Sequence, residues 1–189
     1  MAAAADARYM IGPYTVADWL ALPATVDGSR VELINGYLHV TPPPSTGHQR
    51  AAGRLARLLE DAIRSQGRSE WDVLQAVGVQ ISTAWRTALI PDLVVLDRKI
   101  DVAIVPTDAL LLAVEVWSPG NTRAERETKK AAYAAAGVPF FWALTTDCLT
   151  AYRLVNGEYV VENELDTSAA GTITSAPVPV KLDLAELRP

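Results

Sequence analysis

The sequence predicts an α/β fold in which helices flank a β-sheet of mixed strand direction, with a β-hairpin near the N-terminus. Three observations support this prediction: an Asn-Gly turn between two apolar runs, two amphipathic helical stretches, and strand-like segments at irregular spacing. Because helices follow only some of the strands, an alternating doubly wound sheet is not expected. The 189 residues suffice for one sizeable core, so we expect a single domain over residues 1–189.

The hairpin is the first clear sheet signal along the chain. Asn35-Gly36 suits the positive φ angles of a two-residue turn, and the runs Val31–Ile34 and Tyr37–Thr41 flank it. A short helix from Thr15 to Leu22 is expected before the hairpin. A long amphipathic helix from about His48 to Gln66 is expected after it, with Gly67 as its C-terminal stop.

The rest of the chain is expected to supply a second long helix and most of the sheet. Thr122 and Glu125 have the spacing of a capping box, and Gly137 suits the left-handed residue that ends a helix. The expected strands are Val73–Ile81, Leu93–Leu96, Leu110–Trp117, Phe140–Leu144, Leu149–Leu154 and Val180–Leu184.

Two further segments lack a strong apolar pattern. Asn156-Gly157 can turn the chain again toward Tyr159. The stretch from Thr167 to Pro179 is rich in Ser, Thr, Ala and Pro, and we expect it to be irregular.

Composition narrows the possible classes of protein. No apolar run reaches the roughly 18 to 20 residues that a membrane helix needs, and Asp6 and Arg8 interrupt the opening segment before a secretory core can form. We therefore expect a soluble, cytoplasmic protein with no membrane partner. Cys148 is the lone cysteine, which excludes an internal disulfide and favours a packing role. The formal charge of −5 argues against a wholly basic nucleic-acid coat but allows one basic face.

Two acids stand out because they lie on apolar strands. Asp92 follows Pro91 and opens the run DLVVLD, and Glu115 lies inside LLLAVEVWSP. Burying a carboxylate costs several kcal/mol unless a cation or hydrogen-bond donors compensate it, so we expect a cation at Glu115. Taken separately, Asp92 can simply end a loop and Glu115 can pair with a structural arginine. Together they indicate a divalent-metal site.

The same residues carry a resemblance to a known family. Pro91-Asp92 followed by Glu115-Val116-Trp117 is similar to the PD-(D/E)XK pattern of the restriction-endonuclease-like superfamily. The stretches VELINGYLHVTPPPSTGHQR, IPDLVVLD and EVWSPGNTRAERETKKAAYAAAGVPFFW resemble the Uma family of restriction endonucleases from about Tyr14 to Leu154. The resemblance implies a restriction-endonuclease-like fold and a Mg²⁺- or Mn²⁺-dependent nuclease.

The resemblance also implies roles for individual residues. Asp92 and Glu115 would be the carboxylate ligands of the metal, and Val116 would offer its backbone carbonyl, because magnesium prefers hard oxygen ligands. The superfamily lysine would stand at position 117, where this chain has Trp117. In the Uma family this lysine lies on the next helix, four residues before a tyrosine, which Lys129 matches. Lys130 is the alternative, and both lysines can also simply solvate a helix surface.

Two accessory residues match the family pattern as well. Glu32, beside the hairpin turn, would support the metal site or hold its water, although an exposed hairpin residue has the same sequence signature. His48 would contact phosphate or relay a proton at neutral pH, or it would have a local capping role at the helix start. Helical spacing places Lys129 on one face with Glu125 and Tyr133, and Lys130 on another.

A basic stripe is expected on the long helix. Arg50, Arg54 and Arg57 lie near one line of the helix and would bind nucleic acid, although exposed helices commonly carry such arginines. The function expected from the sequence is a Mg²⁺-dependent endodeoxyribonuclease that acts as a homodimer. The main alternative is a catalytically inactive nucleic-acid-binding or assembly module on the same fold. Hydrolysis of a small phosphate ester is a weaker third reading, because the chain has no glycine-rich phosphate loop.

Overall fold

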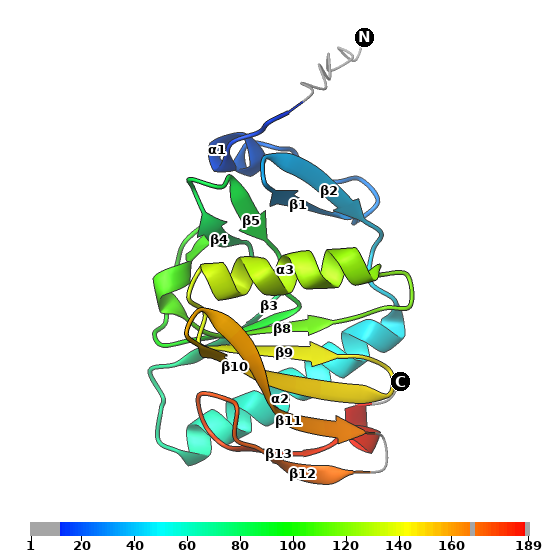
Figure 1. Cartoon of the computed structure of the whole chain (residues 1–189), viewed down its shortest axis with the longest axis vertical. Coiled ribbons are helices and arrows are strands. Elements are labelled where there is room, and N and C mark those ends of the chain that lie inside the picture. Colours follow the sequence, from blue (N-terminus) through cyan, green and yellow to red (C-terminus); the bar gives the residue numbers. More distant parts are fainter. Residues whose placement is uncertain (1–11, 167–168, 188–189) are drawn as a thin grey trace.

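The computed structural model of the chain describes residues 12–166 and 169–187 (Figure 1). The opening segment with Asp6 and Arg8 lies outside the described residues. No helix in the described part of the chain is long and apolar enough to cross a membrane. The helices are α1 (Val16–Leu20), α2 (Thr46–Ser65), η1 (Thr107–Ala109), α3 (Arg123–Ala135) and η2 (Leu184–Leu187), where η marks a 3-10 helix.

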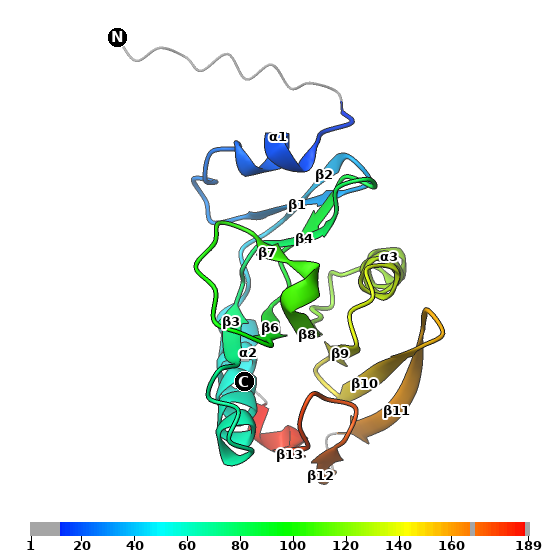
Figure 2. The same cartoon turned by 90° about the vertical axis from the view of Figure 1, so that its left-hand side faces the viewer.

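A six-stranded mixed sheet forms the centre of the molecule. Strands β8 and β9 run parallel, and every other neighbouring pair is antiparallel, which confirms the mixed α/β architecture. Helix α2 covers one face and α3 the other (Figure 2). In spatial order the strands are β11 (Glu158–Asp166), β10 (Cys148–Val155), β9 (Phe140–Leu144), β8 (Leu110–Val116), β6 (Leu93–Leu96) and β3 (Asp72–Gln75).

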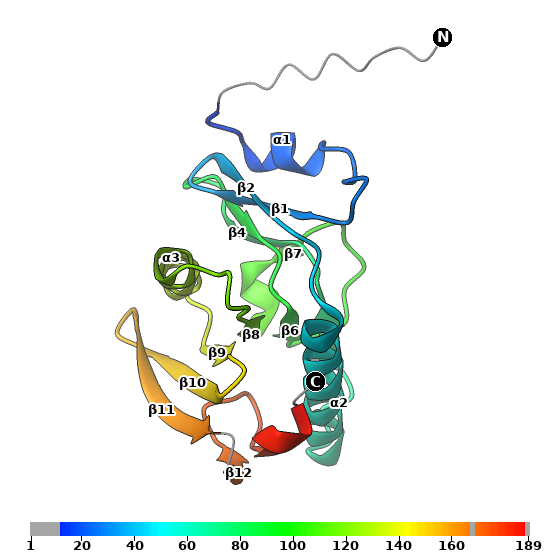
Figure 3. The same ribbon diagram turned by 90° about the vertical axis from the view of Figure 1, so that its right-hand side faces the viewer.

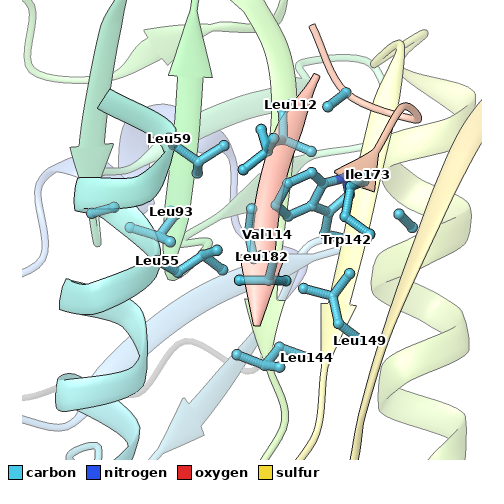
Figure 4. Packing of buried hydrophobic residues seen from close by; sticks show 14 of the residues in the cluster. Leu55, Leu59, Leu93, Leu112, Val114, Trp142, Leu144, Leu149, Ile173 and Leu182 are labelled. Carbon is cyan, nitrogen blue, oxygen red and sulfur yellow. The ribbon is translucent and has the colours of Figure 1, made fainter. Parts of the chain in front are cut away.

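The larger core lies between α2 and this sheet. Leu55 and Leu59 project from α2 onto Leu93, Leu112 and other buried side chains of the central strands, because leucines at helical spacing form one apolar face (Figure 4). A two-stranded sheet of β12 (Ala170–Ile173) and β13 (Val180–Asp183) packs against this core at the bottom of the view in Figure 1. The 3-10 helix η2 then packs beside α2 (Figure 3).

Strand β8 shows how the sheet divides its side chains between the two layers. Leu112 and Val114 belong to the core under α2, whereas Ala113 and Trp117 belong to the cluster that includes Tyr133 of α3. Because successive residues of a strand point to opposite faces, Glu115 faces the α3 layer. The strand pattern therefore places this acid under α3.

A second, five-stranded sheet contains the β1–β2 hairpin and lies above the central sheet in the view of Figure 1. Asn35 and Gly36 both have positive φ, 52° and 83°, as the two-residue turn requires. Helix α1 packs against this sheet, where Trp19 donates to the backbone carbonyl of Val31 at 2.7 Å. The strand order is β2 (Tyr37–Thr41), β1 (Arg30–Ile34), β5 (Thr87–Leu89), β4 (Val79–Ser82) and β7 (Val105–Pro106).

The helix ends match the sequence signals closely. Gly67 and Gly137 have φ of 70° and 78°, so both provide the left-handed stop. Thr122 accepts from the backbone N–H of Glu125, as expected for the N-cap of α3. The carboxylate of Glu125 instead accepts from the side-chain amide of Asn121 at 2.8 Å.

The prediction of one strand over Val73–Ile81 is wrong. The segment divides into β3, in the central sheet, and β4, in the second sheet. Ala76, between them, has a φ of 52°, a left-handed conformation that interrupts an extended strand. A continuous apolar pattern thus conceals a change of sheet.

The prediction of an irregular segment from Thr167 to Pro179 is also wrong in part. Residues 167–168 lie outside the described chain, but Ala170–Ile173 forms β12, whose Ile173 is fully buried. Pairing with β13 holds this segment extended despite its composition. Strands β5, β7 and the long β11 were not predicted either, because β5 and β7 are very short and β11 alternates weakly along a mostly exposed edge.

Candidate functional site

A cleft of about 480 Å³ opens where the β1–β2 hairpin and the first turns of α2 and α3 meet one end of the central sheet. Its walls include six residues singled out from the sequence, which come from separate segments of the chain. These residues are Glu32, His48, Asp92, Glu115, Val116 and Lys129. Tertiary structure therefore brings the predicted acids, cation and histidine into one cleft.

Asp92 lies just before β6 and is 3% exposed. Strands β6 and β8 pair with Leu93 opposite Val114, so continuing this register places Asp92 beside Glu115. The Oδ2 atom of Asp92 accepts the backbone N–H of Val116 at 2.7 Å and lies 3.2 Å from Nε2 of His48.

The Oδ1 atom of Asp92 accepts from the guanidinium of Arg30. Burial alone would raise the pKa of this carboxyl, but His48 and Arg30 together hold that pKa below its ordinary value. Asp92 is therefore an ionised carboxylate within a set of donors, and it does more than end a loop.

Glu115 is equally buried but less well compensated. Its Oε1 accepts from the hydroxyl of Tyr133 at 2.8 Å, and Nζ of Lys129 lies 3.4 Å from both carboxylate oxygens. The cation expected at Glu115 is thus Lys129. Burial raises the pKa of Glu115 to about 8 in spite of Lys129, and the negative charges of Asp92 and Glu32 add to the increase.

Lys129 projects from the buried face of α3 into the acids. Its Nζ lies 2.7 Å from Oε2 of Glu32 and 5.8 Å from the ring centre of Trp117. Burial alone would lower the pKa of this ammonium group, but the charges of Glu115 and Glu32 raise its pKa above the ordinary value. Lys129 is consequently a permanent cation of the cleft.

Glu32 is a buried residue of this cleft. Its side chain is 2% exposed, so the alternative of an exposed hairpin position is wrong. Its Oε1 accepts from the backbone N–H of Ile90 at 2.7 Å, and its Oε2 pairs with Lys129. Glu32 therefore joins the hairpin to α3 and to the segment just before Asp92.

His48 lies in the first turn of α2, whose N-cap is Ser45. The backbone N–H of His48 donates to the Ser45 hydroxyl, while its side chain turns toward Asp92. The Nδ1 atom is buried and has no hydrogen-bond partner within the described part of the chain. The side chain thus contacts the acid site, and Ser45 provides the cap.

Lys130 and the arginines of α2 lie outside this cluster. Lys130 pairs with Glu127 at 2.9 Å and does not line the cleft. Arg50 and Arg57 are exposed on α2. Arg54 donates to the backbone carbonyl of Glu186 at 2.7 Å, which ties α2 to the C-terminal 3-10 helix.

Two residues of the site were not assigned from the sequence. Arg30 lies two residues before Glu32 in β1, and the two-residue period of a strand could have indicated that both face the cleft. Tyr133 enters the family pattern only as the tyrosine four residues after the lysine. It is fully buried, and burial together with the nearby carboxylates raises the pKa of its hydroxyl, so the hydroxyl stays protonated as a donor to Glu115.

The balance of charge shows whether a cation fits here. Among the described residues that line the cleft, the four acids Glu32, Asp92, Glu115 and Glu125 face two permanent cations, Arg30 and Lys129. An excess of negative charge and hard oxygen donors suits Mg²⁺ or Mn²⁺. No group of three or more His, Cys, Asp or Glu side chains within residues 12–166 and 169–187 forms a metal cage by itself. The donor set thus fits an ion that keeps most of its water ligands.

Comparison with known proteins gives the chain a relative of the same fold. The model of the Uma2 family, described as "Putative restriction endonuclease", matches residues 16–184. The chain is similar to the crystal structure of "a putative nuclease belonging to DUF820" from Anabaena variabilis, with 18% sequence identity and a TM-score of 0.69. That alignment covers 93% of this chain and 97% of the other, and it establishes the fold.

Two other comparisons say nothing about the fold or the function of this chain. A cryo-EM structure of a DrdV-DNA complex aligns with 14% identity over 64% of this chain and 12% of that one. Its TM-score of 0.33 is too low to bear on fold or substrate. No curated protein matches the chain.

Proposed function

This chain belongs to the Uma2 family, and on that premise we propose that it is a metal-dependent nuclease that hydrolyses phosphodiester bonds in DNA. The observation that carries the proposal is the burial of three carboxylates and one ammonium group in a single cleft. Glu32, Asp92, Glu115 and Lys129 are each no more than 5% exposed. Burying several charges is unfavourable for folding alone, so such a cluster in a cleft points to a functional site.

Asp92 and Glu115 would hold the Mg²⁺ or Mn²⁺ ion, with the backbone carbonyl of Val116 as a third oxygen donor. When bound, such an ion acts as a Lewis acid toward the phosphate and makes a neighbouring water more acidic. The chain holds Asp92 ready for this role, because His48, Arg30 and the Val116 N–H keep its carboxyl ionised. Tyr133 orients Glu115 through its hydroxyl.

Lys129 is the residue we assign to stabilising charge on the phosphate. Its ammonium group is buried and permanently charged, and a buried cation acts on a neighbouring charge more strongly than a cation surrounded by water. Glu32 positions that ammonium at 2.7 Å. Its other oxygen accepts from the backbone N–H of Ile90, so Glu32 is held in place as the supporting acid that orients Lys129.

One observation favours a second candidate function, a nucleic-acid-binding module without turnover. Trp117 occupies the strand position where the superfamily pattern has lysine, and its ring packs against Lys129 and Arg126. If Lys129 serves only to neutralise the buried acids, the protein would bind DNA without cutting it.

A cleavage assay separates these two functions. We expect the purified protein to nick supercoiled plasmid with Mg²⁺ or Mn²⁺ and to bind Ca²⁺ with little turnover. Asp92→Asn and Glu115→Gln should abolish cleavage and weaken metal binding measured by calorimetry, while Lys130→Ala should cleave normally. DNA binding without cleavage under every metal would favour the module. Failure to bind any divalent ion at millimolar concentration would refute the metal site.

Homodimerisation belongs to the same proposal. A nuclease that cuts both strands of a duplex commonly pairs two sites by twofold symmetry. Light scattering at several protein concentrations tests this directly. A monomer that nicks one strand would separate nuclease activity from dimerisation.

A further inference from the structure

Arg30 stands at the inner wall of the cleft, in contact with the proposed metal ligand Asp92. It is the first residue of β1, and its Nη1 atom donates to Oδ1 of Asp92. The side chain is 22% exposed, whereas Asp92 is 3% exposed. Arg30 therefore links a buried carboxylate to the open part of the cleft.

The guanidinium has donors to spare. An arginine carries five N–H groups in a planar fork, and the side-chain contact found for Arg30 among the described residues uses Nη1 alone. Its other nitrogens are not among the buried, unpartnered atoms of the described chain. The unused donors are thus accessible from the cleft.

The hairpin register shows on which face of the hairpin Arg30 lies. Arg30 pairs with Thr41 across β1 and β2, and Glu32 pairs with His39, so Arg30 and Glu32 lie on the same face of the hairpin. Pro42, Pro43 and Pro44 follow Thr41 and line the same cleft. Arg30 accordingly contacts Asp92 and pairs with the residue that precedes the three prolines, within the cleft that contains the acids.

We propose that Arg30 binds the phosphodiester of the substrate while Asp92 binds the metal ion. This inference depends on the nuclease function proposed above. A guanidinium fork matches two phosphate oxygens, and the anionic cleft otherwise offers only Lys129 as a permanent cation among its described lining residues. The alternative is that Arg30 serves only as a structural counter-ion for Asp92.

The two roles predict different effects of removing the charge. If Arg30 binds phosphate, Arg30→Gln weakens DNA binding, but it leaves metal affinity unchanged or higher because a cation beside the metal ligand has gone. If Arg30 is only a counter-ion for Asp92, Arg30→Gln reduces DNA affinity only as far as it reduces the fraction of folded protein. Stability measured on the same samples distinguishes these cases.

The test measures DNA binding by fluorescence anisotropy on the full chain in Ca²⁺ and in EDTA, and Mn²⁺ affinity by calorimetry. We expect Arg30→Gln to weaken DNA binding tenfold or more and Arg30→Lys to restore part of the loss. Arg153→Gln is the matched control. Arg153 is also a strand arginine paired with an acid, Glu162, but it lies outside the cleft.

A second pair of variants removes the effect of an unpaired Asp92. Arg30→Gln should weaken DNA binding in EDTA by a similar factor in the wild-type and Asp92→Asn backgrounds. Unchanged DNA affinity in Arg30→Gln, or a loss that disappears in the Asp92→Asn background, would overturn the phosphate role alone. If the wild type binds neither Mn²⁺ nor DNA, the proposed function fails as well, and Arg30 has no substrate to bind.

Discussion

Lys129 lies closer to Glu32 than to Glu115: its Nζ is 2.7 Å from Oε2 of Glu32 and 3.4 Å from either oxygen of Glu115. The hairpin acid therefore makes the closer ion pair with Lys129, although the charges of both acids raise the pKa of the ammonium group. Burial is the main reason why Glu115 keeps a proton in spite of Lys129, and the charges of Asp92 and Glu32 add to it by raising the pKa of Glu115 further. This asymmetry distinguishes the two acids that share Lys129, and it determines what several variants should do.

Replacing Lys129 should separate catalysis from metal binding. Lys129→Met should reduce turnover a hundredfold or more, because a transition-state cation contributes roughly 3 to 4 kcal/mol. Metal affinity should persist or rise, since the acids lose a competing cation. Lys130→Ala is the control and should be mild, because Lys130 pairs with Glu127 outside the cleft. Equal activity of the two variants would refute the assignment of Lys129.

The Lys129 variant should also lose stability when metal is absent. Removing the cationic partner of a buried ion pair leaves the carboxylate of Glu32 uncompensated and costs about 3 to 5 kcal/mol. Thermal unfolding of Lys129→Met should therefore occur at a lower temperature in EDTA and recover with millimolar Mg²⁺. A variant as stable as the wild type in EDTA would show that the ion pair between Lys129 and Glu32 contributes nothing to stability.

Trp117 offers a direct test of the displaced lysine. Trp117 directly follows β8, two residues after Glu115, and both residues line the cleft. Trp117→Lys in the Lys129→Ala background should regain part of the lost cleavage. Far-ultraviolet circular dichroism and thermal unfolding must confirm a folded protein, because Trp117 is 7% exposed. A folded double variant with no regained activity would argue that only α3 can supply the cation.

Stability without metal should fall as pH rises from about 5 to 8. Folding raises the pKa of Glu115 from 4.5 to about 8, so the folded state binds its proton more tightly than the unfolded state. The stabilisation from this proton is complete below pH 4.5 and is lost as pH rises through 8, by at most about 1.4 kcal/mol per pH unit. Glu115→Gln should show a flatter profile of unfolding temperature against pH. A wild-type profile identical to that of the variant would contradict the raised pKa.

Tyr133→Phe isolates one hydrogen bond in the site. The substitution removes the hydroxyl that donates to Glu115 at 2.8 Å and keeps the ring that stacks on Phe141. Losing a buried bond to a charged group should lower stability by about 1.5 to 3 kcal/mol above pH 8. The loss should be smaller at pH 6, where Glu115 holds a proton. Chemical denaturation at the two pH values measures the difference, and an equal loss at both would refute the coupling.

The arginines of α2 should differ in their effect on DNA. Arg50 and Arg57 are exposed, so Arg50→Gln with Arg57→Gln should reduce the salt dependence of DNA binding by roughly one slope unit per lost phosphate contact. Arg54→Gln should instead lower stability, because Arg54 donates to the carbonyl of Glu186. Titrations at several salt concentrations provide the slope. An unchanged slope would direct the DNA path toward Arg123 and Arg126.

Local sequence patterns were sufficient for the parts of the fold that depend on neighbouring residues. Asn35-Gly36 forms the expected turn, and Gly137 ends α3, because the left-handed conformation is a property of one or two residues. Leu55 and Leu59 bury the expected face of α2. The same local logic indicated that Glu115 needs a cation, which Lys129 supplies.

The failures came where a distant segment decides the outcome. The apolar run Val73–Ile81 gives no sign that its two halves join different sheets, since this depends on which strands stand beside them. The segment Ala170–Ile173 becomes a strand because β13 offers backbone partners, and composition cannot show this. Arg30 was not assigned from the sequence, because its role depends on contact with Asp92 from a distant segment of the chain.

The resemblance to the Uma family pointed to Lys129. The residues by themselves determined the helix ends, the hairpin turn and the two acids that carry charge into apolar strands. These features follow from backbone preferences and desolvation, which act within a few residues. Tertiary structure alone decided which acids and donors meet. Lys129 lies closer to Glu32 than to Glu115, the hydroxyl of Tyr133 donates to Glu115, and the guanidinium of Arg30 donates to Asp92. These relationships depend on strand register and helix packing between segments far apart in the chain, and local periodicity carries no record of either.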